Sequence, residues 1–129
     1  MSGFVAVPAQ GSVEVWFKST SLSDVGFIGW LDGTANGTMM LYSAGGLSVS
    51  FYAGTAETTA VVTVNDGAWH HAVGTYDGTD GRLYVDGDLV AGPTALTHTA
   101  GTSANSFKLG VYSGGPTMTL YPAVSGRRT

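Results

Sequence analysis

The chain has 129 residues, a formal net charge of −4 and no cysteine. The lack of cysteine excludes disulfides, thiolate zinc sites and cysteine nucleophiles, and a count of five basic against nine acidic residues argues against nucleic-acid binding. With 43% hydrophobic and only 11% charged residues, the composition is that of a folded chain of one domain. We expect a single domain over residues 1–129, with a core over 3–122 and a short polar, basic tail over 123–129.

Alternation of apolar and polar residues dominates the chain, and no segment shows a sustained helical period. In residues 12–18 the apolar side is formed by Val13, Val15 and Phe17. Residues 47–53 alternate in the same way, with Leu47, Val49 and Phe51 inward and Ser48, Ser50 and Tyr52 outward. We predict about eleven short strands, near residues 3–7, 12–18, 25–31, 38–43, 47–53, 58–64, 69–76, 82–85, 89–91, 106–112 and 117–121.

Residues 66–91 predict three antiparallel strands joined by tight turns. Asp86-Gly87 separates the last two of them, and Asp-Gly tolerates the positive φ angles that a type I′ hairpin turn requires. The longest irregular stretch is Gly92–Ser106, and a loop of that length is often functional. Many short strands with frequent turns predict an all-β sandwich or barrel.

A pattern in this region resembles the laminin-G-like jelly rolls of the concanavalin A-like lectin/glucanase superfamily. It reads Trp69-His70-His71, then Thr75-Tyr76-Asp77-Gly78, then Leu83-Tyr84-Val85-Asp86-Gly87, then Leu89-Val90. The resemblance implies a two-sheet antiparallel β-sandwich in which Trp69, His71, Tyr84, Asp86 and Gly87 are scaffold, with Trp69 in the core. The chain departs from the family pattern at both ends of the match: little room precedes the segment 4–7, and the stretch 110–120 is short. An absent or shortened strand would leave an open sheet edge that a partner chain could cover.

Enzymatic chemistry finds little support in the ionisable residues. A retaining glycosidase needs two carboxylates about 5–5.5 Å apart, whereas Glu14 and Glu57 have no second acid at the matching strand positions and most Asp precede Gly in turns. His70 and His71 are adjacent in a predicted strand, so they point to opposite faces and cannot chelate one ion together. We expect one of them beside Trp69 and the other in solvent.

Exposed aromatic residues beside polar ones are what a sugar-binding surface needs. The candidate ligand-binding residues are Trp30, Asp32, Asn36, Tyr42, Tyr52 and Tyr112. Trp16 also falls on the outward side of its strand. The family resemblance further implies a calcium site at the loop rim before the strand 38–43, where Asp32 and Asn36 are the available oxygen ligands. Calcium is therefore the candidate cofactor.

The sequence favours a non-catalytic binding or adhesion module that recognises a glycan or a protein surface through its rim loops. The alternative is a structural virion protein, such as a phage capsid decoration or tail-associated subunit, that self-associates or assembles onto a larger particle through open sheet edges. A glycoside hydrolase is a distant third. No signal-peptide pattern and no apolar run of about 20 residues is present, so we expect cytoplasmic synthesis, no membrane span, and a location at the cell exterior or virion surface.

Overall fold

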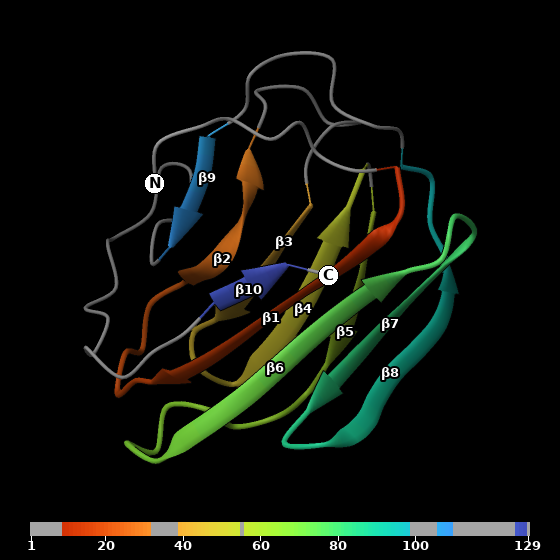
Figure 1. Ribbon diagram of the computed structural model, residues 1–129. Coiled ribbons are helices and arrows are strands. Elements are labelled where there is room, and N and C mark those ends of the chain that lie inside the picture. Colours follow the sequence, from red (N-terminus) through yellow and green to blue (C-terminus); the bar gives the residue numbers. More distant parts are fainter. Residues whose placement is uncertain (1–8, 32–38, 55, 99–105, 110–125, 129) are drawn as a thin grey trace.

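The computed structural model describes residues 9–31, 39–54, 56–98, 106–109 and 126–128. Within these ranges the chain forms strands and no helix (Figure 1). For Trp30, Leu31 and the last two strands the description covers the backbone only. The strands are β1 (Gly11–Lys18), β2 (Val25–Leu31), β3 (Met39–Ala44), β4 (Ser48–Ala53), β5 (Ala56–Ala60), β6 (Trp69–Tyr76), β7 (Asp80–Val85), β8 (Asp88–Ala95), β9 (Ser106–Leu109) and β10 (Gly126–Arg128).

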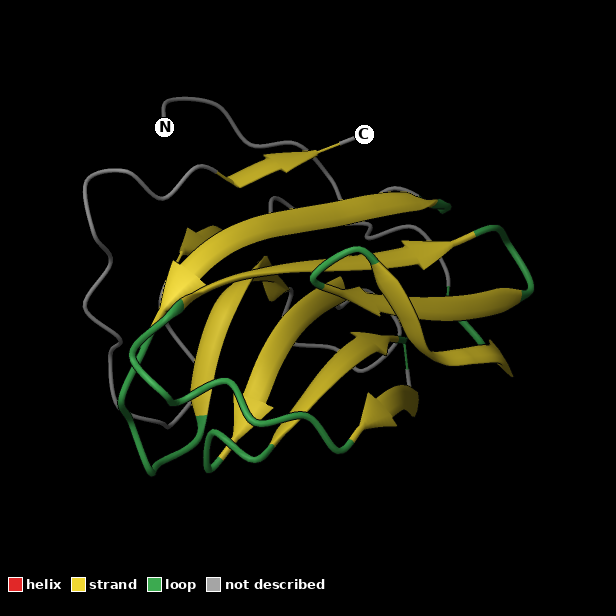
Figure 2. Cartoon of the chain, turned by 90° about the horizontal axis from the view of Figure 1, so that it is seen from below, coloured by secondary structure: helices red, strands yellow, loops and turns green. Residues whose placement is uncertain are grey.

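The strands form two antiparallel sheets that stack on each other (Figure 2). The first sheet has the order β10-β1-β6-β7-β8, and the second has the order β5-β4-β3-β2-β9. This arrangement confirms the predicted two-sheet sandwich. The predicted strands over residues 3–7 and 117–121 lie outside the described residues.

The core lies between the sheets and is built from the inward-facing residues of each strand. Val13, Val15 and Phe17 of β1 are completely buried, as are Val49 and Phe51 of β4. Full burial of an aliphatic or aromatic side chain of this size contributes about 1.5–3 kcal/mol. The alternation in residues 12–18 therefore predicted the buried face of β1 correctly.

The β7–β8 hairpin turns at the residues that the sequence indicated. Asp86 has φ of 53° and Gly87 has φ of 90°, which are the two positive values that a type I′ turn needs. Both strands of the hairpin are longer than predicted: β7 begins at Asp80, and β8 continues to Ala95. Gly92–Ser106 is thus not irregular throughout, since its first four residues complete β8, and residues 99–105 lie outside the description.

A short polar contact closes one side of the sandwich. Thr58 of β5 and Thr94 of β8 place their hydroxyl oxygens 3.0 Å apart, and β5 and β8 are edge strands of the two sheets. The hydrogen bond therefore joins the sheets along this side.

The predicted inward and outward sets of residues 47–53 need correction at two positions. Leu47 is 60% exposed, because it belongs to the turn that precedes β4 and not to the strand. Ser50 faces outward yet is buried, and its hydroxyl lies 2.7 Å from that of Thr59 on β5. The neighbouring strand, not the alternation, sets the exposure of Ser50.

The segment expected as a tail contributes a strand. Residues 126–128 pair with β1 as β10, with Arg127 opposite Glu14 and Arg128 opposite Val13. The backbone of Arg127 and Arg128 therefore lies in the first sheet.

Candidate functional site

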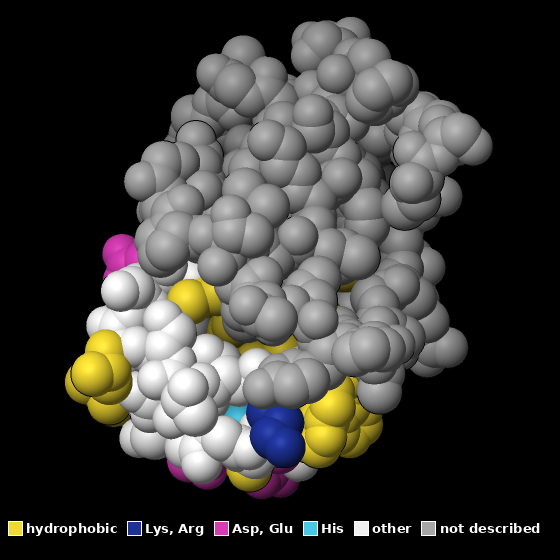
Figure 3. Space-filling view, turned by 90° about the vertical axis from the view of Figure 1, so that its left-hand side faces the viewer, with side chains coloured by type: hydrophobic (Ala, Val, Ile, Leu, Met, Phe, Trp, Pro, Cys, Tyr) yellow, Lys and Arg dark blue, Asp and Glu magenta, His cyan; other side chains and the backbone are white. Residues whose placement is uncertain are grey.

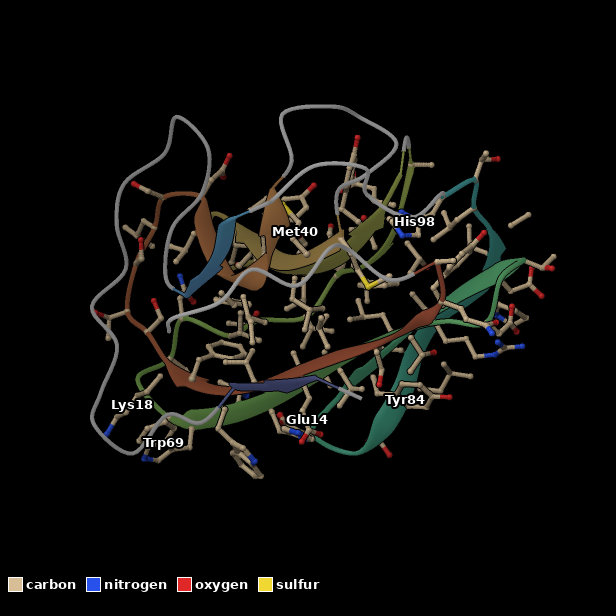
Figure 4. The ribbon with its side chains drawn as sticks, turned by 45° about the horizontal axis from the view of Figure 1, so that its top comes forward. Glu14, Lys18, Met40, Trp69, Tyr84 and His98 are labelled. Atoms are coloured by element: carbon tan, nitrogen blue, oxygen red, sulfur yellow. The ribbon has the colours of Figure 1, made fainter. Side chains whose placement is uncertain are left out.

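The outer face of the first sheet carries a group of aromatic side chains. In β1 the residues between the core positions are Glu14, Trp16 and Lys18, and they face away from the core. Register places Trp16 opposite His71 and Lys18 opposite Trp69 on β6. Figure 4 shows Glu14, Lys18, Trp69 and Tyr84 on this outer side of β1, β6 and β7. We call the surface formed by Trp16, Trp69, His71 and Tyr84, with Glu14 and Lys18 beside them, the aromatic face.

Trp16 and His71 form the centre of the aromatic face. Their rings stack with centroids 4.7 Å apart and an interplanar angle of 23°. The Nε2 atom of His71 also lies 3.4 Å from Oε2 of Glu14. Trp16 nevertheless remains 47% exposed, so a large aromatic surface is held in a fixed orientation beside a carboxylate and an imidazole.

Trp69 extends this surface and corrects a prediction. It was expected in the core, but it is 40% exposed and lies on the same outer side as His71. The strand runs Trp69-His70-His71, and the inward position falls on His70 because His70 shares the phase of the buried Ala72 and Tyr76. The sequence contains the information for this assignment, since alternation from Ala72 backwards gives the same phase.

His70 is a buried histidine that contacts two carboxylates. Its Nδ1 lies 2.9 Å from Oδ2 of Asp86, and its Nε2 lies 2.9 Å from Oδ1 of Asp66. Its ring also contacts Phe17, with centroids 5.8 Å apart. Asp66 precedes β6 and Asp86 lies in the β7–β8 turn, so His70 ties two segments to the start of β6.

The electrostatics of this cluster favour the charged forms of His70 and Asp66. Burial alone would lower the pKa of His70, but the hydrogen bonds and charges of Asp86 and Asp66 outweigh burial and raise it above the usual value. The pKa of Asp66 is lowered, first because its carboxylate accepts a hydrogen bond from the Ala68 N–H and second because it contacts His70. His70 and His71 lie on opposite sides of β6, as predicted.

Asp86 also fixes the hairpin to β6 through the backbone. Its Oδ1 accepts a hydrogen bond from the His71 N–H at 2.9 Å, and its own N–H donates to the His71 carbonyl at 2.8 Å. The role of Asp86 as scaffold, which the family resemblance implied, agrees with these contacts.

Two of the predicted ligand-binding residues lie on the outer face of the second sheet. Tyr42 and Tyr52 are half-buried there, on β3 and β4. The Tyr42 hydroxyl donates a hydrogen bond to Glu57, which pairs with Tyr52 in the β4–β5 ladder. The aromatic face lies on the other sheet, so the structure does not bring Tyr42 and Tyr52 to Trp16 and Trp69.

For the remaining predicted residues the structure describes the backbone of Trp30 alone. Trp30 pairs with Met39 in the backbone register of β2 and β3, and Asp32, Asn36 and Tyr112 lie outside the described residues. Among the residues that the structure describes, no group of three or more His, Asp or Glu side chains could hold a metal ion. The calcium site at Asp32 and Asn36 stays a prediction.

A depression in the described surface is smaller than a usual small-molecule pocket. A depression lined by Ser19, Ser21, Val25, Phe27, Ser43, Gly46 and Val64 has about 160 Å³ of space, open solvent included. Small-molecule pockets usually have about 300–1,000 Å³. Figure 3 shows hydrophobic side chains gathered in separate patches at the surface of this end of the molecule. In the part of the chain described, no helix is long and apolar enough to cross a membrane.

The two stacked sheets and the tight β7–β8 hairpin define an antiparallel jelly-roll sandwich. Residues 4–120 match the family model described as the concanavalin A-like lectin/glucanases superfamily. The chain belongs to this superfamily, as its sequence pattern indicated.

Known relatives agree with this assignment. The chain is 35% identical over 86 residues to the Sushi, von Willebrand factor type A, EGF and pentraxin domain-containing protein 1 of Rattus norvegicus and of Mus musculus. That match covers 64% of this chain and 2% of each relative, so the chain spans only a small part of their length. Among solved structures, the heptameric SAP-like pentraxin of Limulus polyphemus has a similar fold, with a TM-score of 0.59, 12% identity, and coverage of 83% of this chain and 55% of that one.

Proposed function

We propose that the protein is a non-catalytic binding or adhesion module that contacts a glycan through the aromatic face. The observation that carries this proposal is the pair of tryptophans on one regular sheet face, with Trp16 47% and Trp69 40% exposed. Tryptophan rings offer flat apolar surfaces for sugar rings, and the neighbouring Glu14, His71 and Lys18 offer hydrogen-bonding partners for hydroxyl groups. The sheet, and not the rim loops, is then the main contact surface.

The contacts of the ionisable residues support a non-catalytic role. Both ring nitrogens of His70 contact carboxylates, so His70 has no nitrogen left for a substrate proton. Asp77 accepts hydrogen bonds from the Thr79 and Asp80 N–H groups and from Arg82, and Asp24 accepts one from the Gly45 N–H. These carboxylates accept hydrogen bonds from backbone N–H groups of turns and loops, which is the usual structural role of Asp at such positions.

The proposal is tested with a glycan array, in the presence of calcium and again with a chelator. We expect the wild-type protein to bind at least one glycan class, and Trp16→Ala to reduce that binding at least tenfold because the stacking surface is removed. Val61→Ala is the matched control, because Val61 is 92% exposed and follows β5 of the second sheet, away from the aromatic face. The chelator arm tests the predicted calcium dependence separately.

The outcomes separate the versions of the proposal. Equal binding by wild-type and Trp16→Ala proteins would show that the aromatic face is not the contact surface. Failure to bind any glycan in either condition would overturn the glycan version and leave a protein surface as the ligand.

Self-association is a second candidate function, and it includes assembly onto a larger particle such as a virion. The exposed aliphatic residues at one end of the sandwich favour it: Leu22 is 81% and Leu47 is 60% exposed, and both adjoin the β3–β4 turn, since the Leu22 carbonyl lies close to Gly45. The heptameric state named for the Limulus pentraxin is consistent with it. Size-exclusion chromatography with light scattering is expected to show oligomers that Leu22→Ser weakens, and a monomer at every concentration would contradict this candidate.

A further inference from the structure

Both ring nitrogens of His70 face carboxylates, an arrangement that favours two protons on the ring. A neutral imidazole has one N–H donor and one acceptor nitrogen, whereas an ionised carboxylate can only accept. Each ring nitrogen of His70 lies 2.9 Å from a carboxylate oxygen, one from Asp86 and one from Asp66. Both contacts are hydrogen bonds only when His70 is an imidazolium, because in the neutral ring one nitrogen lone pair would face a carboxylate.

The cluster lies directly beneath one end of the aromatic face. Trp69 is the residue before His70, and the Ala68 N–H before it donates to the same Asp66 oxygen that contacts His70. After Trp69 in the chain, Asp86 contacts the His70 ring through Oδ2 and accepts a hydrogen bond from the His71 N–H through Oδ1. The cluster therefore holds the backbone on both sides of Trp69, at Ala68 and at His71.

We propose that Asp66, His70 and Asp86 form a pH-dependent latch, which fixes the Trp69 end of the aromatic face while His70 carries two ring protons and releases it when one is lost. The groups acting on His70 are the Asp86 carboxylate from the β7–β8 turn and the Asp66 carboxylate from the loop before β6, while β1 presents the uncharged Phe17 ring. Loss of one ring proton removes the hydrogen bond from His70 to one of the two carboxylates, which then keeps only its backbone donor. The consequence for ligand binding rests on the glycan-binding function proposed above, but the latch itself does not.

The sign of the pH dependence follows from the two shifted groups. The raised pKa of His70 means that its contribution to stability is complete below the ordinary histidine value of about 6.5 and is lost as pH rises through the raised value. The lowered pKa of Asp66 means that its contribution to stability is present above the ordinary aspartate value of 3.8 and is lost as pH falls through the lowered value. The latch is thus closed in mildly acidic solution and opens on the alkaline side.

The first experiment follows the ring nitrogens of His70 by NMR in ¹⁵N-labelled protein without ligand. We expect both nitrogens to be protonated at pH 6.5, a titration midpoint above the ordinary value of about 6.5, and a lower midpoint in Asp86→Asn and in Asp66→Asn. Asp77→Asn is the matched control, because Asp77 also accepts backbone hydrogen bonds but at the other end of β6. A midpoint at or below the ordinary value, or one that neither variant lowers, would overturn the latch.

The second experiment measures amide hydrogen exchange of Ala68 and His71, corrected for the intrinsic effect of pH. We expect exchange of both amides to increase at least tenfold as His70 loses its second proton, since both donate to the carboxylates of the latch. Exchange that does not change across the His70 midpoint would also overturn the proposal.

Glycan binding then connects the latch with the aromatic face. We expect affinity to fall at least threefold above the His70 midpoint in the wild type and in Asp77→Asn. If Trp16→Ala abolishes binding but wild-type affinity is the same on both sides of the midpoint, the regulation is refuted and the binding function stands. If no glycan binds, the binding function fails, and the NMR and exchange results still decide the latch.

Discussion

The outer faces of the two sheets alternate in the same way but differ in what they expose. On the first sheet, Trp16 and Trp69 are 47% and 40% exposed. On the second sheet, Met40 and Ser50 occupy equivalent outward positions, and they are 6% and 2% exposed. Alternation decides on which side of a sheet a residue lies, whereas the neighbouring residues decide whether solvent reaches it.

Glycine on the adjacent strand is one cause of the difference. Gly29 pairs with Met40, and a Cβ atom at position 29 would overlap Met40. The missing side chain of Gly29 therefore provides the space in which Met40 packs. Opposite Trp16 the neighbour is His71, a large ring that stacks against the tryptophan and leaves part of it in solvent.

The largest expected effect is a difference in the free energy of unfolding between a substitution on one outer face and a substitution on the other. Met40→Ala should lower the free energy of unfolding by about 2–5 kcal/mol, as for other buried methionines. Trp16→Ala should change it by no more than about 1 kcal/mol, because substitutions of exposed residues have small effects. Urea denaturation monitored by circular dichroism measures both values. Equal losses in the two variants would mean that the outer faces do not differ in packing.

A smaller effect is expected from the polar contact on the second sheet. Tyr42→Phe removes the hydrogen bond to Glu57 and should destabilise by about 0.5–1 kcal/mol, because Glu57 is exposed and solvent weakens the contact. Glu57→Gln keeps an acceptor and should cost less in the same denaturation experiment. An unchanged stability in Tyr42→Phe would show that this bond contributes nothing measurable.

The fold was largely predictable from the sequence because its determinants are local. Val13, Val15 and Phe17 alternate with polar residues within one strand, and Asp86-Gly87 fixes a hairpin through the backbone preferences of two residues. Errors arose where a strand begins. In the sequence, Leu47 continues the alternation of β4. In the structure it lies in the β3–β4 turn, and the strand starts at Ser48.

The candidate site was less predictable because it depends on pairing between distant segments. Trp16 and His71 meet only through the β1–β6 register, and His70 meets Asp86 across the β6–β7 pair. The Trp-His-His sequence alone does not show which of the three side chains faces the core, and only the alternation counted back from Ala72 assigns that position to His70. Of the residues proposed from sequence, Tyr42 and Tyr52 are described on the opposite sheet, and Asp32, Asn36 and Tyr112 lie beyond the part of the chain that is described.

The order of the strands along the chain has a consequence for synthesis and folding. The strands β2, β3, β4 and β5 pair with successive neighbours, so most of the second sheet can form from contiguous chain. β1 pairs instead with β6 and β10, and closing such long loops costs entropy before the contacts repay it. During translation β1 has no partner in its sheet until residues 69–76 have left the ribosome, so its apolar residues depend on the second sheet for cover until then.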